Sequence, residues 1–521
     1  MSTCVFHHPV NLVTHPWIPV VGLDGKGRLA CLQDVFRDGG SLADLSLQPQ
    51  DRISVLNLLI CVAQRSLDGP KGRADHAACR EHIGPAALDY LARPEISRCF
   101  ELLGGGPRFL QIHGKGNPGT VSLGKLGGVD ENGSLLFQPS MTAETPRDPA
   151  WVALRLLAFQ NYAPGGKVGG AEMQGSRLAP VSGSAGPRRD MNSVHGFLRG
   201  SDLLATIWAN LVPLDALPAG QDFGQPTWEL LGRLAEPFLH RIPEEDSGNR
   251  SYLGRLVPLS RAIWVDKGLT QCELTVGIEY PGFTLGVRDP SVTVRTSRSR
   301  QGQESLALVG CARGGEMQQV WREIPAVLAV GSPGAQERGP LAFSGAGCVE
   351  NAGEMVDIWM GGVGGDQANT IDFFESSYRV PAGVLRDDSQ HAVWRRAFES
   401  GVAKADGKLS EVQFKIDLWC GHAFPGSGPK EIARISRSRK TDAARHFWSI
   451  LQKHHGMLVE EANAALLSPA KTLDASDGAP WPRLVDKTAE EAFAAVCPST
   501  GRRQLRATAL ARTGRRPQKK C

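Results

Sequence analysis

The stretch "RISVLNLLICVAQRSL" (Arg52–Leu67) decides how the first part of this chain folds. Apolar side chains recur in it at Ile53, Leu56, Leu59 and Ile60, which is the spacing of one face of a helix. These positions predict a helix with a buried apolar stripe. The segments on either side must therefore supply the elements that cover it.

The segments that follow predict a mixture of helices and strands. "PAWVALRLLAFQNY" (Pro149–Tyr162) predicts a second helix, in which Asp148 is the N-cap and a proline occupies the first turn. "CELTVGIEYPGFTL" (272–285) and "PSVTVRT" (290–296) are typical of strands, because β-branched residues alternate in part with others. Gly- and Pro-rich connections separate these elements. We therefore expect a mixed α/β body over residues 1–384.

The pattern changes after about residue 385, where helical periodicity replaces short strands. Four segments separated by helix-breaking residues predict a four-helix bundle over residues 385–521. The expected fold class is α+β, with a mixed α/β N-terminal body followed by a C-terminal four-helix bundle. The four segments are "DSQHAVWRRAFESGVAKA", "KLSEVQFKIDLWCGHAF", "KTDAARHFWSILQKHHGMLVEEANAAL" and "PRLVDKTAEEAFAAVC" with "GRRQLRATALARTG".

The composition is that of a folded protein. Hydrophobic residues make up 41% of the 521 residues, which is ample for buried cores in two domains. The sequence has no run of about 18 apolar residues, and its first residues lack the basic and apolar regions of a secretory signal. We therefore expect a cytoplasmic protein without membrane contact.

The 11 cysteines are scattered along the sequence, without a CxxC pair or a close quartet of cysteine and histidine. The nearest approach is "WCGH", which contains Cys420 and His422. Such cysteines behave as small apolar residues in a reducing compartment. We expect no bound metal and no cofactor.

Basic residues are unevenly distributed, although the net charge is only +4. "RTSRSR" (Arg295–Arg300) and "ARISRSRK" (Ala433–Lys440) form clusters, and the last 21 residues hold eight Lys or Arg and no acidic residue. Lysine and arginine that contact phosphates release condensed counterions, so these clusters favour a polyanionic partner. The alternative is solvated surface charge and, for Ala433–Lys440, a loop before a helix.

A glycine-rich segment, "APGGKVGGAEMQG" (Ala163–Gly175), follows the second helix within what we expect to be a long loop. It lacks the GxxxxGK[ST] pattern of a phosphate-binding loop, and the sequence contains neither HExxH nor GxSxG. A nucleotide-using enzyme is therefore disfavoured. The glycines can bring the backbone close to a nucleic-acid groove while Lys167 supplies charge. The alternative is a flexible surface loop.

The stretch "MGGVGGDQANTID" (Met360–Asp372) places an Asp-Gln-Ala triplet directly after four glycines. A glutamine on such a loop, Gln367, can be inserted between stacked base pairs, at a cost of roughly a few kcal/mol that other contacts must offset. The alternative is a solvated turn before a helix that Asn369 or Thr370 caps. We expect a helix to begin directly after the triplet.

Seven motifs cover nearly the whole chain and follow one another in a characteristic order. They are "NLVTHPWIPV" (Asn11–Val20), "LNLLICVAQ" (Leu56–Gln64), "PRFLQ" (Pro107–Gln111), "QPTWE" (Gln225–Glu229), "MGGVGGDQANTIDFFESSYRV" (Met360–Val380), "AARHFW" (Ala443–Trp448) and "LRATALAR" (Leu505–Arg512). Through their collinearity the sequence resembles the CasA family, the large subunits of type I-E CRISPR Cascade surveillance complexes.

The resemblance implies a non-catalytic role in antiviral defence. In Cascade this subunit recognises the protospacer-adjacent motif (PAM) on double-stranded DNA and starts the strand separation that lets guide RNA pair with its target, forming an R-loop. It also helps recruit a helicase-nuclease. The implied partners are the guide RNA complex, with its backbone, handle-capping and small subunits, the target DNA and that nuclease. The alternatives are a general basic DNA-binding scaffold and, less favoured, a nucleotide-using enzyme.

The resemblance also implies which residues contact nucleic acid. A further loop near "NGSLLF", with Asn132 and Phe137, resembles the segment that contacts the guide RNA end and a neighbouring subunit. The family's wedge loop maps onto Asp366, Gln367 and Ala368. The family's glycine loop, which approaches the minor groove, maps onto Gly165, Gly166, Lys167, Val168, Gly169 and Gly170.

The sequence departs from the family pattern in three places. Asp366 replaces the asparagine that is common in the wedge, which puts a carboxylate near phosphates. The family's lysine finger has no direct counterpart, and Arg288 is the nearest basic residue. A cysteine cluster that some members carry is not visible, in line with no bound metal. In the bundle, the predicted phosphate contacts are Arg437, Arg439 and Lys440.

Overall fold

Helix α2 (Pro49–Leu67) is the helix that the first quoted stretch predicts, and this computed structural model places it within a large apolar core. Nearly all of its side chains are buried, not only one stripe. The reason is that α4 (Ile83–Ala92), α6 (Pro149–Tyr162) and α9 (Tyr252–Leu256) all pack against it. The second predicted helix is α6, and Asp148 caps it by accepting from the Ala150 N–H over 2.8 Å.

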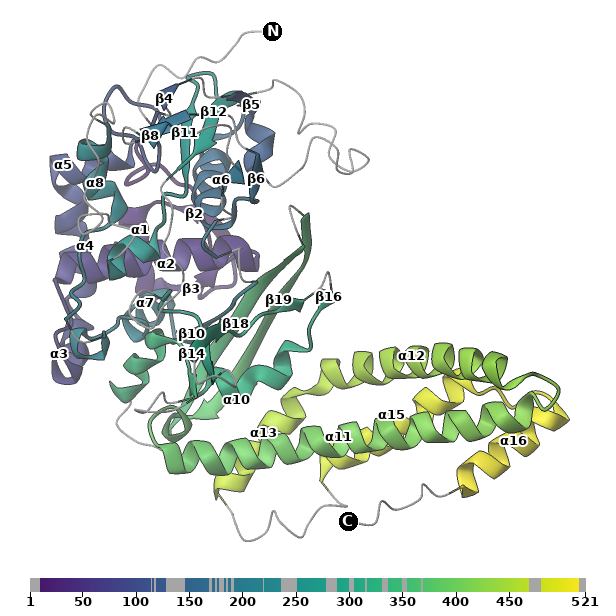
Figure 1. The fold of residues 1–521 in the computed structure, drawn as a ribbon. Coiled ribbons are helices and arrows are strands. Elements are labelled where there is room, and N and C mark those ends of the chain that lie inside the picture. The colour runs from purple at the N-terminus through teal and green to yellow at the C-terminus, as the bar shows by residue number, and fades with distance from the viewer. Residues whose placement is uncertain are drawn as a thin grey trace. The chain divides into compact units, whose positions relative to one another are not determined.

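The chain divides into two units (Figure 1). The first unit comprises Met1–Val320 and Ala326–Arg386, and the second comprises Trp321–Pro325 and Asp387–Cys521. The structure describes residues 10–113, 115–116, 119–127, 146–167, 171–173, 176–177, 182–183, 186–188, 192–218, 220–235, 251–277, 288–298, 304–313, 316–329, 336–348, 354–366, 369–467 and 479–514.

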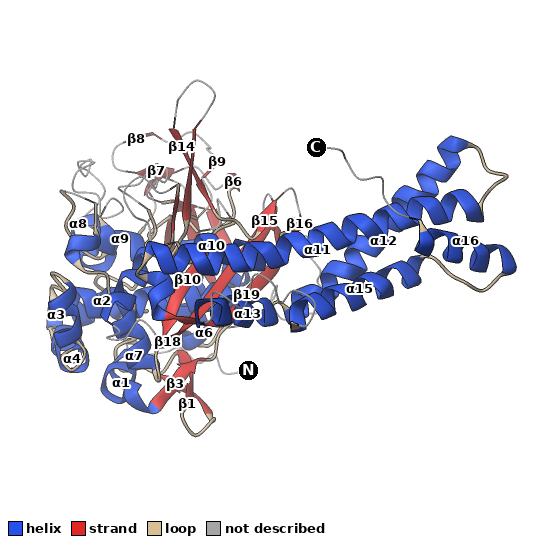
Figure 2. Cartoon of the chain, turned by 90° about the horizontal axis from the view of Figure 1, so that it is seen from below, coloured by secondary structure: helices blue, strands red, loops and turns tan. Residues whose placement is uncertain are grey.

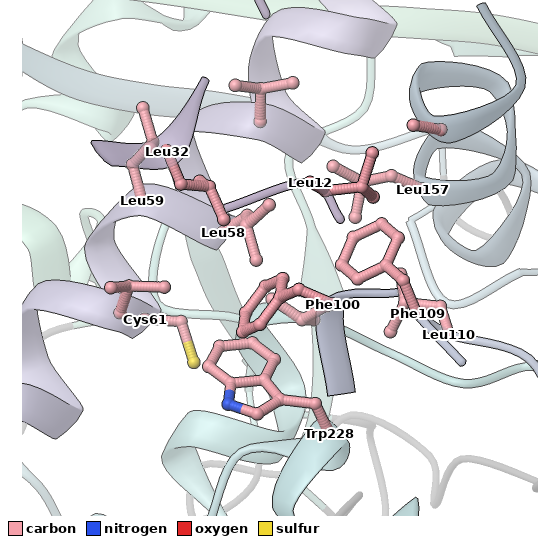
Figure 3. Packing of buried hydrophobic residues seen from close by; sticks show 14 of the residues in the cluster. Leu12, Leu32, Leu58, Leu59, Cys61, Phe100, Phe109, Leu110, Leu157 and Trp228 are labelled. Carbon is pink, nitrogen blue, oxygen red and sulfur yellow. The ribbon is translucent and has the colours of Figure 1, made fainter. Parts of the chain in front are cut away.

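Aromatic rings complete the core beside α2 (Figure 3). The ring centroid of Phe100 lies 5.6 Å from that of Phe109 and 5.3 Å from that of Trp228. The Trp228 indole N–H donates to Tyr90 Oη over 2.7 Å, so its polar edge is satisfied inside the core. Rings and α2 side chains such as Leu58 therefore form one continuous apolar cluster in the first unit.

Short helices and small antiparallel sheets surround this core. The other described α-helices here are α1 (Leu32–Asp38), α3 (Arg73–Cys79), α5 (Pro94–Ser97), α7 (Leu203–Ala209) and α8 (Thr227–Ala235), and α10 (Ile324–Val327) spans the sequence boundary between the two units. Strand order in the described sheets is β2-β1-β3, β11-β12-β5, β14-β13-β17, β4-β7-β8, β15-β16 and β6-β9. Their bounds are β1 (Ile18–Gly22), β2 (Gly27–Ala30), β3 (Leu42–Leu45), β4 (Lys115–Gly116), β5 (Gly119–Ser122), β6 (Gly166–Lys167), β7 (Ala171–Met173), β8 (Ser176–Arg177), β9 (Ser182–Gly183), β11 (Arg261–Val265), β12 (Gln271–Val276), β13 (Val294–Arg298), β14 (Glu304–Leu308), β15 (Ala312–Arg313), β16 (Glu316–Met317) and β17 (Glu337–Arg338).

A long hairpin of β18 (Met355–Asp366) and β19 (Asn369–Pro381) forms the remaining sheet with β10 (Val194–Arg199). The predicted helix after the Asp-Gln-Ala triplet is therefore wrong. Burial along β19 has a period of two, since Tyr378 and Val380 are buried while the residue between them is exposed. That alternation is the signature of a strand with one covered face.

The second unit is helical. Figure 2 shows α11 and α12 as its longest helices, and the two contact each other. The fold class expected from the sequence, α+β with a C-terminal helical bundle, is confirmed. The described helices of this unit are α11 (Asp388–Ala423), α12 (Pro429–His454), α13 (Gly456–Leu467), α15 (Pro480–Val496) and α16 (Arg502–Thr513).

Helix boundaries in this unit differ from the prediction. The first two predicted helices are one helix, α11, which runs for 36 residues through Asp406 and Gly407. A glycine inside a helix costs only about 1 kcal/mol, which the packing of a long helix can offset. The third predicted helix is instead interrupted at His455, between α12 and α13. The cluster "ARISRSRK" is part of α12 and not a loop before it.

A tryptophan from outside the bundle sequence completes its core. Trp321 is only 1% exposed, and its ring centroid lies 5.9 Å from those of both His455 and Trp481. The rings of Trp448 and Phe398 lie 6.2 and 6.4 Å away. We call these five residues the tryptophan cluster. The five-residue segment Trp321–Pro325 therefore belongs to the second unit although it lies far upstream.

In the described part of the chain, no helix combines the length and the apolar character that crossing a membrane requires.

Candidate nucleic-acid interface

The predicted wedge lies at the end of the long hairpin. Asp366 is the last residue of β18 and pairs with Asn369, the first residue of β19. Gln367 and Ala368, which stand between them in the sequence, are outside the described residues. The described part therefore fixes the two strand ends from which the wedge continues.

Asn192 holds the hairpin close to the wedge. Its side-chain amide donates to the Gly365 carbonyl over 3.1 Å, and its side-chain oxygen accepts from the Gly365 N–H over 2.7 Å. We call this pair of bonds the Asn192 clamp. Asn192 has φ 49°, a left-handed conformation that asparagine tolerates better than most residues. The ladder also shifts register between Gly364 and Gly365, so the clamp satisfies backbone groups at an irregular point.

Sequence reasoning did not identify Asn192. It lies at the end of the Gly-rich stretch and two residues before β10, where nothing in the local pattern indicates a contact with a residue 173 positions later. An asparagine placed shortly before a strand is a weak signal for a left-handed turn. The partner of its side chain could be found only from the structure.

The predicted glycine loop is described in part. Gly165 is half-buried, and Gly166 and Lys167 form β6, which pairs with β9. Val168, Gly169 and Gly170 lie outside the described residues. The expected long loop is corrected here, since its described parts include short antiparallel strands.

Arg261 fixes the entrance to this segment. The Arg261 side chain is 3% exposed and donates to the carbonyl of Ser260 over 2.9 Å and of Pro164 over 3.0 Å. Burial lowers the pKa of Arg261 to about 10, so the guanidinium stays charged near neutral pH. The position of Pro164, directly before the predicted glycine loop, is thus set by the core of the first unit.

A buried polar network consists of Arg188, Asp289, Ser291 and His195. Arg188 Nε lies 2.7 Å from Asp289 Oδ2, and the Ser291 hydroxyl donates to Asp289 Oδ1 over 2.5 Å. His195 Nδ1 lies 2.8 Å from Ser291 Oγ. Burial alone would raise the pKa of Asp289, but Arg188, His195 and Ser291 together lower it, so this carboxylate is ionised.

The network contains serine, histidine and aspartate but not in a catalytic order. Ser291 gives its only hydroxyl proton to Asp289, so His195 Nδ1 must donate to Ser291 rather than withdraw a proton from it. A nucleophilic triad needs the histidine between the acid and the serine. Burial lowers the pKa of His195 to about 4, with Asp289 opposing and Arg188 reinforcing the shift. The arrangement anchors three segments and does not activate a nucleophile.

The predicted basic contacts in the second unit have unequal surroundings. Arg437 is exposed on α12. Arg439 donates to the Val496 carbonyl at the end of α15, and its guanidinium lies 4.9 Å from the Trp419 ring centroid. Lys440 Nζ lies 2.5 Å from an Asp417 carboxylate oxygen. Arg439 and Lys440 therefore already have partners inside the bundle, whereas Arg437 faces solvent.

Arg288 is half-buried and donates to the Arg338 carbonyl over 3.4 Å. Burial, reinforced by the positive charge of Arg338, lowers the pKa of Arg288 to about 10. Its contact with DNA stays a prediction. Asn132 and Phe137, the predicted RNA or subunit contacts, are outside the described residues. The described residues contain no group of three or more His, Cys, Asp or Glu arranged to hold a metal ion.

Comparisons with known proteins bear on the identity of the chain. The family model described as CRISPR-associated protein Cse1 matches residues 11–490. A CRISPR-associated protein CasA/Cse1 from Thermus thermophilus is 24% identical over 393 residues, which is 72% of this chain and 72% of the relative.

Solved structures share the fold. CasA from Thermus thermophilus superposes with a TM-score of 0.70 at 20% identity, covering 97% of this chain and 98% of that one. Cse1 from Acidimicrobium ferrooxidans superposes with a TM-score of 0.73 at 19% identity, covering 97% of this chain and 96% of that one. A chain of a CRISPR RNA-guided surveillance complex superposes with a TM-score of 0.68 at 17% identity, covering 97% of this chain and 99% of that one. Because the family model spans most of the sequence and the fold agrees from end to end, the chain belongs to the Cse1 (CasA) family of CRISPR-associated proteins.

Proposed function

We propose that this chain is the large subunit of a type I-E Cascade complex, where it recognises the PAM on double-stranded DNA and starts strand separation. Membership of the Cse1 family and the fold shared with a chain of an RNA-guided surveillance complex support the placement in Cascade. The proposal includes recruitment of the helicase-nuclease. It requires no covalent chemistry of this chain, and the reversed order of Ser291 and His195 in the buried network is in keeping with that.

The observation that carries the proposal is the clamped hairpin. A wedge must keep its position while base pairs resist separation, so the strands behind it need a rigid support. The hairpin is paired along its length, and the Asn192 clamp holds Gly365, two residues before Gln367 in the sequence. A glutamine that follows such a supported hairpin can insert its side chain between stacked base pairs. On an unsupported loop, the resistance of the base pairs would displace the same side chain.

Initiation is the step for which a wedge matters most. The RNA–DNA heteroduplex is about as stable as the DNA it replaces, with DNA stacking near ~1.4 kcal/mol per step, so later exchange is nearly balanced. In the proposal, the glycine loop from Gly165 to Gly170, with Lys167, samples the minor groove while Asp366, Gln367 and Ala368 open the first pair. Arg288, Arg437, Arg439 and Lys440 are predicted to contact phosphates, and Asn132 and Phe137 to contact guide RNA or a neighbouring subunit.

The test measures strand opening on two DNA targets that share a protospacer and differ in PAM. The guide RNA complex is assembled with and without this chain, and a fluorescent base beside the PAM reports opening. Opening that requires both the chain and one PAM supports the proposal. Strand opening that is the same with and without this chain refutes the proposal. DNA binding without PAM preference indicates a general DNA-binding scaffold instead.

Two substitutions examine the wedge itself. Gln367→Ala should slow opening at least about tenfold, since it removes the inserted side chain, and should leave salt-dependent affinity for non-target DNA unchanged. Asn192→Ala should slow opening less, because the wedge stays but its support loosens. Asn192→Asp, which keeps the acceptor for the Gly365 N–H, should fall between Asn192→Ala and wild type. Equal loss of opening and of non-target binding would contradict a wedge.

A further inference from the structure

A pocket in the first unit contains two arginines and does not belong to the hairpin. It has a volume of about 380 Å³, which is within the usual size range of small-molecule sites. Its walls combine polar groups with apolar side chains such as Leu217, Pro340 and Phe343. The guanidinium-bearing residues Arg288 and Arg338 line it together with Ser344. We call it the two-arginine pocket.

Within the described part of the chain, two polar groups of this pocket lack the partners that buried groups usually have. Arg338 Nε and Ser344 Oγ are buried, and the structure gives neither a hydrogen-bond partner. Among the described residues, the Arg288 side chain forms a single hydrogen bond, a long one of 3.4 Å to the Arg338 carbonyl. Asp289, the next residue, points to Arg188 and Ser291 instead. Among the described residues, no carboxylate forms an ion pair with either pocket arginine.

Other half-buried arginines of the same unit do have carboxylate partners. Arg295 Nε lies 2.8 Å from Glu337 Oε1, and Arg199 lies 2.7 Å from Asp44. Glu337 directly precedes Arg338 on β17, and neighbouring residues of a strand point to opposite faces. The strand therefore places its carboxylate on one side and the Arg338 side chain, without a carboxylate, on the other. Among the described residues neither pocket arginine has an ion-pair partner, and withdrawing charge from water without one is costly, so the pocket favours an anion.

We propose that the two-arginine pocket binds the phosphate group of a small ligand, either free phosphate or a phosphate monoester. Two guanidinium groups match the charge of a phosphate dianion and form short, charge-assisted hydrogen bonds with its oxygens. The Ser344 hydroxyl donates a further bond. The apolar wall formed by Leu217, Pro340 and Phe343 accommodates the organic part of a monoester. Binding of such a ligand needs neither guide RNA nor DNA, and it is an alternative to the predicted DNA contact of Arg288.

The pKa of Arg288 agrees with this arrangement. Burial and the nearby Arg338 lower it to about 10, which means that the charged form is disfavoured in the pocket without an anion. A bound phosphate reverses the second of these effects because it places negative charge between the two guanidinium groups.

The experiment titrates inorganic phosphate into the purified full-length chain by calorimetry, in chloride buffer at constant ionic strength. The wild-type chain should bind one phosphate saturably. Arg338→Met and Arg288→Met should each weaken binding about tenfold or more, and Ser344→Ala should weaken it less. Arg199→Met is the matched control, since it removes an arginine whose partner Asp44 still has Arg52, and it should bind like wild type.

Stability in chloride alone separates a ligand site from a structural role. Removing one of two like charges should leave the melting temperature of Arg338→Met no lower than that of wild type. Phosphate should then raise the melting temperature of wild type and not that of the variant. If Arg338→Met melts lower in chloride and still binds phosphate as wild type does, the arginine is structural and the proposal fails.

A second arm identifies the source of the phosphate. Adenosine 5′-monophosphate binding more tightly than inorganic phosphate would identify a monoester ligand, and equal affinities would identify free phosphate. Binding of duplex DNA that depends on Arg288 and Arg338, without binding of either small anion, would overturn the pocket proposal in favour of the predicted DNA contact of Arg288.

Discussion

The two units close their cores in different ways. In the first unit, buried side-chain amides form paired hydrogen bonds with backbone groups: Gln64 Nε2 donates to the Val212 carbonyl over 2.8 Å, and its oxygen accepts from the Val212 N–H. Gln160 similarly donates to the Arg261 carbonyl over 2.9 Å and accepts from its N–H. Rings pack in both cores, but in the second unit the space between the helices is filled by the tryptophan cluster, with Trp321 at its centre.

The difference follows from backbone regularity. A helix satisfies its own interior N–H and C=O groups, so a helical unit is free to fill its core with apolar rings. A body of short strands and connections leaves backbone groups inside the protein, and each of them needs a side-chain partner. Substitutions of the buried polar side chains that pair with backbone should therefore damage the first unit, whereas truncation of Trp321 should damage the second. A single unfolding midpoint is poorly defined for a chain of two units. Hydrogen exchange measures the stability of each unit separately, because it reports on individual helices and strands.

The largest expected effect is that of Trp321→Ala. Removing a fully buried tryptophan should destabilise the second unit by about 3–5 kcal/mol, because the surrounding rings cannot collapse into the space. Exchange should accelerate in α11, α12 and α15 and stay unchanged in α2. Trp321→Phe, which keeps a ring, should recover part of the loss. Faster exchange in α2 as well would mean that the two cores are not independent.

Asp289→Asn should destabilise the first unit, as Trp321→Ala destabilises the second. It leaves the Arg188 guanidinium buried without its carboxylate, which should cost about 3–4 kcal/mol. Exchange should accelerate in β10 and not in α11. The control is Asp24→Asn, which removes an exposed ion pair with Lys26 and should cost less than about 1 kcal/mol. Similar costs for the two substitutions would show that the network does not hold the first unit together.

A smaller effect in the first unit should come from pH. The pKa of His195 is about 4 in the native chain, against about 6.5 for an unfolded histidine, so below pH 6.5 the unfolded chain binds a proton that the native chain does not. Stability should fall by at most about 3 kcal/mol as pH drops from about 6.5 to 4. Glutamine does not titrate in this pH range, so hydrogen exchange in β10 should depend less steeply on pH in the His195→Gln variant than in the wild-type chain. An unchanged slope would exclude His195 as the cause.

The smallest effect should be that of Leu505→Ala. This side chain on α16 is 54% exposed, so its truncation should change stability by less than about 0.5 kcal/mol despite the apolar character of the second unit. Urea unfolding followed by helical circular dichroism would measure it. A cost above about 1 kcal/mol would mean that Leu505 is covered in solution.

The sequence predicted what depends on local periodicity. Helix α2 and the capped helix α6 are present as expected, and the family and the fold class are confirmed. Errors occurred where local signals compete. Asn369 and Thr370 suggested a helix start, but pairing with β18 makes the segment a strand, and Gly407 suggested a break that the packing of α11 overrides.

Contacts between distant residues could not be predicted. Asn192 contacts Gly365, and Trp321 joins rings from three helices of the second unit, because the fold brings them together and no spacing in the sequence indicates it. Arg338 was missed for the same reason. The wedge and glycine-loop assignments stay predictions, since they rest on the family resemblance.

The upstream position of Trp321 also has a consequence during synthesis. The indole leaves the ribosome 160 residues before Trp481, the last member of its cluster. At ~5–20 residues per second, this interval lasts roughly ten to thirty seconds, throughout which a large apolar ring has no complete cover on the growing chain. Nascent chains stalled between α11 and α15 should therefore bind a chaperone at this segment, and release should coincide with the emergence of α15.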